Sequence, residues 1–197
     1  GSRAPYHARA MGNPLRDRRT PSEWAASGQV IEITEKIGDF KRLAGIVEAD
    51  LGTLEPDRMP SGWRDAAVRG QLSFGFADAQ QRMPALDGRL DATVDVVCQR
   101  CLEPFRLPLE ADLRLLFGAG PTDVAGDEGY EGYEVWELDE ERLRPMDLVE
   151  EVLIMALPLA ALHVDDAACA GPAIEVEEQG STIRPFAALK AQMEDEH

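Results

Sequence analysis

Four stretches of the chain alternate apolar and polar residues, as strands with one buried face do. Three of them follow one another with only turn-forming sequence between them. They span residues 29–34, 67–78, 89–97 and 105–117. Because one face of each stretch is apolar and the other polar, the last three predict an antiparallel meander with one face buried, and residues 29–34 predict a separate strand. The sequence YEVWEL at 133–138 predicts a further short strand.

Two other stretches repeat apolar residues at helical spacing. The first follows the strand at 29–34 and places Phe40, Leu43 and the pair Ile46/Val47 on one side of a helix. Asp39 precedes these residues and is a candidate N-cap. This stretch therefore predicts a helix that covers the sheet.

The second helical pattern runs over residues 146–158. Its apolar stripe consists of Leu148, Val152, Met155 and Leu159. Asp147 is a candidate N-cap, and Pro158 marks the end because proline cannot continue a helix. We expect this stripe, including Met155 and Leu159, to pack on the sheet.

The combined pattern predicts an α+β fold, in which one or two helices cover an antiparallel meander. We assign residues 29–170 to a single domain, since a chain of 197 residues suits one domain with extensions. Residues 1–28 are polar and show little periodicity, which predicts a flexible arm that begins with a cleavage scar at Gly1-Ser2. Residues 171–197 predict a loose tail with a short helix at 184–193.

The chain is strongly acidic, with a net charge of −17 from 37 acidic and 20 basic side chains. Residues 123–141 hold nine Asp or Glu and neither Lys nor Arg. Such a run repels itself, so it predicts a solvated acidic loop. The same loop offers a docking surface for a basic partner. The candidate partner-binding residues are Asp127, Glu128, Glu131, Glu134, Glu137 and Asp139.

The acidic balance argues against a protein that grips nucleic acid over its whole surface, but it leaves room for a local basic patch. Seventeen of the twenty basic residues are arginine, whose guanidinium suits bidentate phosphate contact. The candidate RNA-binding residues are Arg100, Arg106 and Arg114, with Arg64 and Arg69 earlier in the chain.

Several functional classes find no support in the sequence. The longest apolar stretch, at 152–162, is shorter than the ~18–20 residues that span a bilayer. Three cysteines, an odd number, argue against a disulfide framework and favour a reducing cytoplasm. The chain contains no G-x-x-x-x-G-K-[ST], G-x-G-x-x-G or H-E-x-x-H motif, and we expect a non-enzyme.

Cys98 and Cys101 stand three positions apart in the sequence CQRC, after the strand at 89–97. A redox pair needs its first thiol at a helix N-terminus, and no such helix is predicted here. A zinc site needs two further ligands, for which His163 and Cys169 are the candidates. Two structural thiols without metal are the third interpretation. The residues alone favour structural thiols over zinc and both over redox chemistry, so the cofactor is none or zinc.

Three blocks of sequence together resemble the YceD family, the large ribosomal RNA subunit accumulation proteins. The first is the C-x-R-C block after a strand, the second an aspartate-led helix ending in Leu-Pro with His and Cys downstream, and the third a short PFA-x-L segment. The matching residues are Cys98, Arg100 and Cys101, then Asp147, Glu151, Leu157, Pro158, His163 and Cys169, then Pro185, Phe186 and Leu189. The resemblance covers roughly residues 29–192.

This resemblance implies a non-enzymatic bacterial or organellar factor for accumulation or processing of large-subunit (23S) rRNA. Its partners would be that rRNA or its precursor, contacted directly or indirectly, and a ribosomal protein or processing factor, with no membrane. The alternative is a small zinc-stabilised rRNA-binding module. A thiol redox protein is the least favoured hypothesis. Some members carry more cysteines near the third block, where this chain has only Cys169.

Overall fold

The computed structural model describes residues 13–118, 130–138, 140–164 and 169, and these carry eleven helices and strands. The helices are the short η1 (Pro14–Arg16), η2 (Ile37–Asp39) and η3 (Trp63–Asp65), and the α-helices α1 (Pro21–Ser27), α2 (Lys41–Leu51) and α3 (Pro145–Ala156). The strands are β1 (Val30–Lys36), β2 (Ala67–Phe76), β3 (Pro84–Val97), β4 (Pro104–Phe117) and β5 (Glu134–Trp136).

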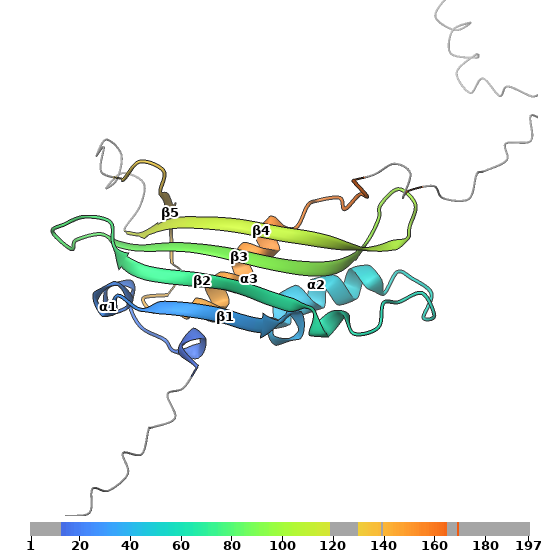
Figure 1. Cartoon of the computed structure of the whole chain (residues 1–197), viewed down its shortest axis with the longest axis horizontal. Coiled ribbons are helices and arrows are strands. Elements are labelled where there is room, and N and C mark those ends of the chain that lie inside the picture. The colour runs from blue at the N-terminus through green and yellow to red at the C-terminus, as the bar shows by residue number, and fades with distance from the viewer. Residues whose placement is uncertain (1–12, 119–129, 139, 165–168, 170–197) are drawn as a thin grey trace, which may run out of the picture.

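The five strands form one sheet in the order β1-β2-β3-β4-β5 (Figure 1). Strands β1 to β4 pair antiparallel, with the longest register between β3 and β4. Strand β5 pairs parallel to the end of β4, where Leu116 lies opposite Val135. The expected antiparallel meander is therefore confirmed for β2, β3 and β4, to which β1 adds a fourth antiparallel strand and β5 a short parallel one.

One face of this sheet is apolar because each strand directs alternate side chains to the same side. Register aligns the apolar positions, so that Leu72 lies opposite Ile31 and Leu86 lies opposite Leu115. The buried residues on this face are Ile31, Ile33, Val68, Leu72, Phe74, Leu86, Leu90, Ala92, Val94, Val96, Leu109, Leu113, Leu115 and Phe117. The apolar positions of the alternating sequence pattern are thus mostly the buried positions of the strands.

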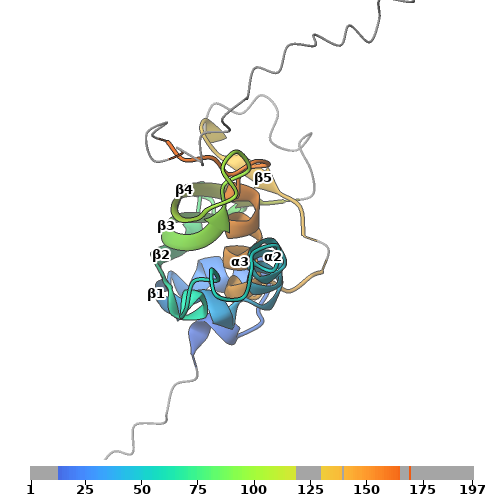
Figure 2. The same cartoon turned by 90° about the vertical axis from the view of Figure 1, so that its right-hand side faces the viewer.

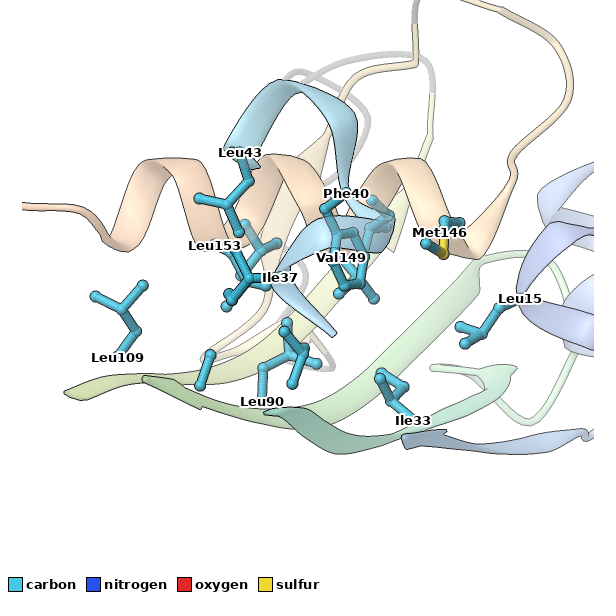
Figure 3. Packing of buried hydrophobic residues seen from close by; sticks show 14 of the residues in the cluster. Leu15, Ile33, Ile37, Phe40, Leu43, Leu90, Leu109, Met146, Val149 and Leu153 are labelled. Atoms are coloured by element: carbon cyan, nitrogen blue, oxygen red, sulfur yellow. The ribbon is translucent and has the colours of Figure 1, made fainter. Parts of the chain in front are cut away.

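Helices α2 and α3 lie on the same side of the sheet, as the end-on view shows (Figure 2). Helix α2 contacts β3, whereas α3 contacts β4 and β3, and the two helices also contact each other. Figure 3 shows Val149 and Leu153 on the sheet-facing side of α3, with Leu90 pointing toward them; all three are fully buried. This architecture confirms the α+β prediction of a sheet covered by two helices.

The expectation of a flexible arm is wrong for residues 13–28. They form η1 and α1, and α1 contacts β2 and β3. Trp24 is fully buried, stacks on Phe74 at 5.0 Å between ring centroids, and donates a 3.2 Å hydrogen bond from its indole N–H to the Leu143 carbonyl. Burial of Trp24 and Ala25 holds this seven-residue helix against the sheet.

The candidate N-cap of the first predicted helix is also wrong. Asp39 belongs to η2, and its carboxylate accepts a 2.9 Å hydrogen bond from the Lys36 backbone N–H. Phe40 occupies the N-cap position of α2 and supplies no side-chain acceptor. Within the predicted apolar pair, Val47 is buried and Ile46 is 44% exposed.

Helix α3 ends before Pro158 as expected, but its buried side differs from the predicted stripe. Met155 is 65% exposed and Leu159 is fully exposed, so neither packs on the sheet. The buried set is Pro145, Met146, Leu148, Val149, Glu150, Val152 and Leu153. At 100° per residue, this face is rotated by roughly a quarter turn from the predicted one.

Asp147 does not cap α3. Arg144 stands at the N-cap position, and Asp147, one turn later, forms an ion pair with its guanidinium. A carboxylate in the first turn still favours the positive end of the helix dipole.

Two expectations lie outside the described residues, namely part of the acidic loop (123–129 and 139) and the short helix at 184–193. Among the helices that the structure describes, none is both long and apolar enough to cross a bilayer.

Candidate metal centre

The structure brings together all four candidate metal ligands, Cys98, Cys101, His163 and Cys169. The two first cysteines lie in the turn between β3 and β4, and the other two residues follow α3. One ligand atom from each residue can be chosen so that all lie within 4.8 Å of one another. Residues more than 60 positions apart in the sequence therefore form one cluster.

Two close pairs make up this cluster. The Sγ atoms of Cys98 and Cys169 are 3.6 Å apart, and Cys101 Sγ lies 3.5 Å from Nδ1 of His163. Cys98 and Cys169 are buried, whereas Cys101 is half-buried. All three cysteines are free thiols.

Backbone hydrogen bonds fix the turn that carries the first two ligands. Cys98 N–H donates to the Glu103 carbonyl at 2.9 Å, and Leu102 N–H donates to the Cys98 carbonyl at 2.9 Å. Leu102 adopts a left-handed conformation, with φ of 60°, which reverses the chain within few residues. Just before the turn, the Asp50 carboxylate of α2 accepts a 2.7 Å hydrogen bond from Val97 N–H.

Two contacts hold the segment after α3 against this turn. Gln99 N–H donates to the Ala161 carbonyl at 2.9 Å, and the ring of Phe105 lies 4.4 Å from that of His163 between centroids. These contacts position His163 beside Cys101. Asp50 and Phe105 were not predicted as parts of the site, since neither carries a local sequence signal that links it to residues across the fold.

The surroundings of the two buried thiols shift their pKa values in opposite directions. Burial by itself would raise the pKa of Cys98. Hydrogen bonds from the backbone N–H groups of Cys101, Arg100 and His163 have the larger effect, and together they lower the pKa of Cys98 to about 5. Burial and the neighbouring thiols of Cys101 and Cys98 raise the pKa of Cys169 to about 11. Preorganised N–H donors around one sulfur are typical of a site built to hold a thiolate.

The distances and donor types fit a tetrahedral zinc ion. Two thiolates each ~2.3 Å from a tetrahedral ion would be about 3.8 Å apart, and a thiolate and an imidazole nitrogen about 3.5 Å apart. The observed pairs, at 3.6 and 3.5 Å, are close to these values. Four protein ligands would leave no open position, which is the arrangement of structural and not catalytic zinc. The redox interpretation lacks its expected feature, because Cys98 follows β3 and does not begin a helix.

The candidate RNA-binding arginines do not gather in one patch. Arg106 and Arg114 lie eight residues apart on β4, which corresponds to ~27 Å along an extended strand. Arg106 is 3.8 Å from Asp95, and Arg114 is 3.5 Å from Asp87 with its guanidinium 4.4 Å over the Tyr133 ring. Arg100 lies near the candidate metal ligands, where its charge opposes part of the rise in the pKa of Cys169.

The two earlier arginines lie elsewhere. Arg64 follows Trp63 in η3 and pairs with Glu48 at 2.8 Å, and Arg69 is an exposed residue of β2. The sequence could not place these side chains relative to one another, since that depends on strand register.

Three of the candidate partner-binding acids lie within the described residues. Glu131, Glu134 and Glu137 are exposed along β5 and its flanks. Asp127, Glu128 and Asp139 lie outside the described residues.

Comparison with known proteins gives one family. The model of the family described as "Large ribosomal RNA subunit accumulation protein YceD" matches residues 86–191. A Haemophilus influenzae protein named "Large ribosomal RNA subunit accumulation protein YceD" is 33% identical over 129 residues, which cover 60% of this chain and 71% of that protein. No solved structure matches the chain significantly. The matched residues include the whole cysteine–histidine cluster, and the chain belongs to the YceD family.

Proposed function

We propose that this protein is a non-enzymatic, cytoplasmic ribosome-biogenesis factor that supports accumulation of large-subunit (23S) rRNA. Membership of the YceD family and the name of the Haemophilus relative support this role. The observation that carries the structural part of the proposal is the convergence of Cys98, Cys101, His163 and Cys169 within 4.8 Å.

In this proposal the cluster holds a structural zinc ion. Cys98 and Cys101 would anchor it to the β3–β4 turn, and His163 and Cys169 would anchor the chain that follows α3. Since such a site does not exist in the unfolded chain, the free energy of metal binding would add to the free energy of folding. The ion would therefore fix the end of the molecule at which two distant segments meet.

The role in rRNA accumulation would be exerted through a basic protein partner that binds the exposed acids Glu131, Glu134 and Glu137. The alternative, direct contact with rRNA through arginines, is less favoured because Arg64, Arg106 and Arg114 each pair with a carboxylate. Such pairing reduces the positive charge that a phosphate backbone would meet.

The zinc site is tested by elemental analysis of full-length protein purified without chelator. We expect about one zinc per chain, a lower melting temperature under a strong chelator, and recovery when zinc is restored. His163→Asn should lose zinc, whereas the neighbouring Leu162→Ala, a non-ligand that is 44% exposed, should retain it. If the purified protein contains no metal and chelator does not change its melting temperature, the zinc site is refuted. The three cysteines would then be structural thiols.

The binding mode is tested in cells whose only copy of the protein is a variant. Glu131→Gln, Glu134→Gln and Glu137→Gln together should reduce mature large-subunit rRNA, and Arg100→Glu with Arg106→Glu should leave it nearly normal. Loss of rRNA only in the arginine variant, with wild-type protein binding naked rRNA in a steeply salt-dependent manner, would show direct RNA contact. Normal rRNA with both variants, and with the gene deleted, would refute the role itself.

A further inference from the structure

Helix α2, the β3–β4 turn and the segment after α3 lie at the same end of the molecule (Figure 1). Residues of these three parts line an apolar groove beside the candidate metal centre. Its volume is about 170 Å³. The groove is lined by Ile46, Val47 and Asp50 of α2, by Val96 and Gln99 around the end of β3, and by Leu157, Pro158, Leu159 and Ala161.

Large apolar side chains are exposed around this groove. Ile46 is 44% exposed, Leu162 is 44% exposed and Leu159 is fully exposed. Two of these exposed side chains, Ile46 and Leu159, line the groove itself, which suits it to contact with another apolar segment.

The volume of the groove indicates what kind of ligand it can hold. Small-molecule pockets usually measure ~300–1,000 Å³. A groove of about 170 Å³ has room for a large apolar side chain, and the apolar rim extends the contact area. The groove is thus suited to an amphipathic segment that inserts one anchor and lays further apolar residues along the rim.

We propose that this groove is the docking site of the chain's own residues 184–193, with the sequence RPFAALKAQM. Phe186, Leu189 and Met193 are spaced by three and seven positions, which places them on one face if the segment is helical. Phe186 is the anchor in the groove, and Leu189 and Met193 cover Ile46 and Leu159 at its rim. Polar and small residues of the segment then face the solvent.

The place at which the tail begins supports this occupant over another molecule. Cys169 lies 3.6 Å from Cys98, whose neighbour Gln99 lines the groove. Phe186 follows Cys169 by about 17 residues, and a flexible chain of that length has an end-to-end distance of ~23 Å. The groove lies within this reach, and a short tether gives an effective concentration in the ~mM range. A second copy at micromolar concentration competes poorly with a tethered segment.

The family match supplies a second argument. It runs from residue 86 to residue 191, so it includes Val96, Gln99, the 157–161 wall of the groove and most of the proposed occupant. One family pattern thus contains part of the groove wall and most of the segment proposed to fill the groove. The proposal concerns packing within the chain, and it stands whether or not zinc or rRNA is bound.

The test is photocrosslinking of the full chain with Phe186→p-benzoylphenylalanine, compared with Ala191→p-benzoylphenylalanine on the opposite face of the segment. We expect the first variant to give internally crosslinked monomer, with peptides containing Ile46 or residues 157–161 attached to position 186. The second should give much less of this product. Dimeric product at position 186 would show a second copy in the groove and overturn the proposal, as would monomer crosslinked elsewhere.

Hydrogen exchange of unlabelled variants provides an independent measurement. Phe186→Asp should increase amide exchange in peptides covering 157–162 severalfold, and Ala191→Asp, which adds the same charge, should change it little. Ile46→Asp, in the exposed part of the groove wall, should increase exchange in peptides covering 184–193. Equal exchange in wild type and all three variants would refute docking.

Discussion

The carboxylate of Glu150, on α3, accepts a 2.6 Å hydrogen bond from the backbone N–H of Arg42, near the start of α2. It also accepts a 3.2 Å hydrogen bond from Leu43 N–H. Because Phe40 has no side-chain acceptor, Glu150 performs from another helix the role that an N-cap residue usually performs. A buried carboxylate thus joins the two helices that cover the sheet.

Removal of this acceptor should destabilise the protein. Glu150→Ala leaves the first N–H groups of α2 without their partner, and we expect a loss of ~1–3 kcal/mol in the free energy of unfolding. Glu151→Ala is the control, because Glu151 pairs with the exposed Arg42 side chain at the surface and should cost ~0–1 kcal/mol. Urea denaturation of both variants measures the difference. Equal effects would contradict the capping role.

The face of α3 that packs on the sheet can be checked with two substitutions. Leu153→Ala removes a fully buried side chain and should cost ~2–5 kcal/mol. Met155→Ala removes one that is 65% exposed and should change stability by less than ~0.5 kcal/mol. Thermal or chemical denaturation measures both. A large effect of Met155→Ala would restore the stripe predicted from the sequence.

Two glycines of β2 should respond in opposite ways to the same substitution. A Cβ at Gly70 would clash with the Arg89 carbonyl oxygen of β3, so Gly70→Ala forces the two strands apart and should cost ~1–3 kcal/mol. A Cβ at Gly75 meets nothing within 4 Å, and Gly75→Ala should stabilise by up to ~1 kcal/mol through reduced chain entropy. The denaturation midpoints of the two variants, compared with that of the wild type, measure these opposite effects. Similar values would show that β2 and β3 do not approach closely at Gly70.

Asp50 should influence the proposed zinc site without being a ligand. Asp50→Ala removes the acceptor for Val97 N–H, next to Cys98, and we expect a stability loss of ~1–3 kcal/mol together with weaker zinc retention against a chelator. Asp57→Ala, which removes an exposed carboxylate from the loop after α2, is the matched control. Competition with a chromogenic chelator measures zinc retention. Unchanged retention in Asp50→Ala would show that the turn holds its shape without this hydrogen bond.

Helix α1 begins with a start signal that can be recognised in the sequence. Thr20, Pro21 and Glu23 form a capping box with proline in the first turn, and this pattern is visible in the sequence as T-P-S-E. The helix it starts is only seven residues long, too short to show hydrophobic periodicity. Its single anchor, Trp24, becomes informative only when Phe74 and Leu143 are known to surround it.

The candidate site was predictable in its members but not in its assembly. Cys98 and Cys101 are close in sequence, and the C-x-x-C spacing by itself suggests ligands. Nothing local indicates that His163 comes beside Cys101. Docking of the segment after α3 on the β3–β4 turn, through Gln99 and Ala161, decides it.

The sequence by itself determined the meander and the existence of both covering helices, because alternation and helical spacing follow directly from which side of each element is buried. It also supplied the four candidate ligand residues and the resemblance to the family. The tertiary structure alone decided the parallel pairing of β5, the buried face of α3, the cap that Glu150 provides to α2, and the convergence of the four ligands. Each of these depends on contacts between residues far apart in the chain, and local periodicity carries no record of such contacts.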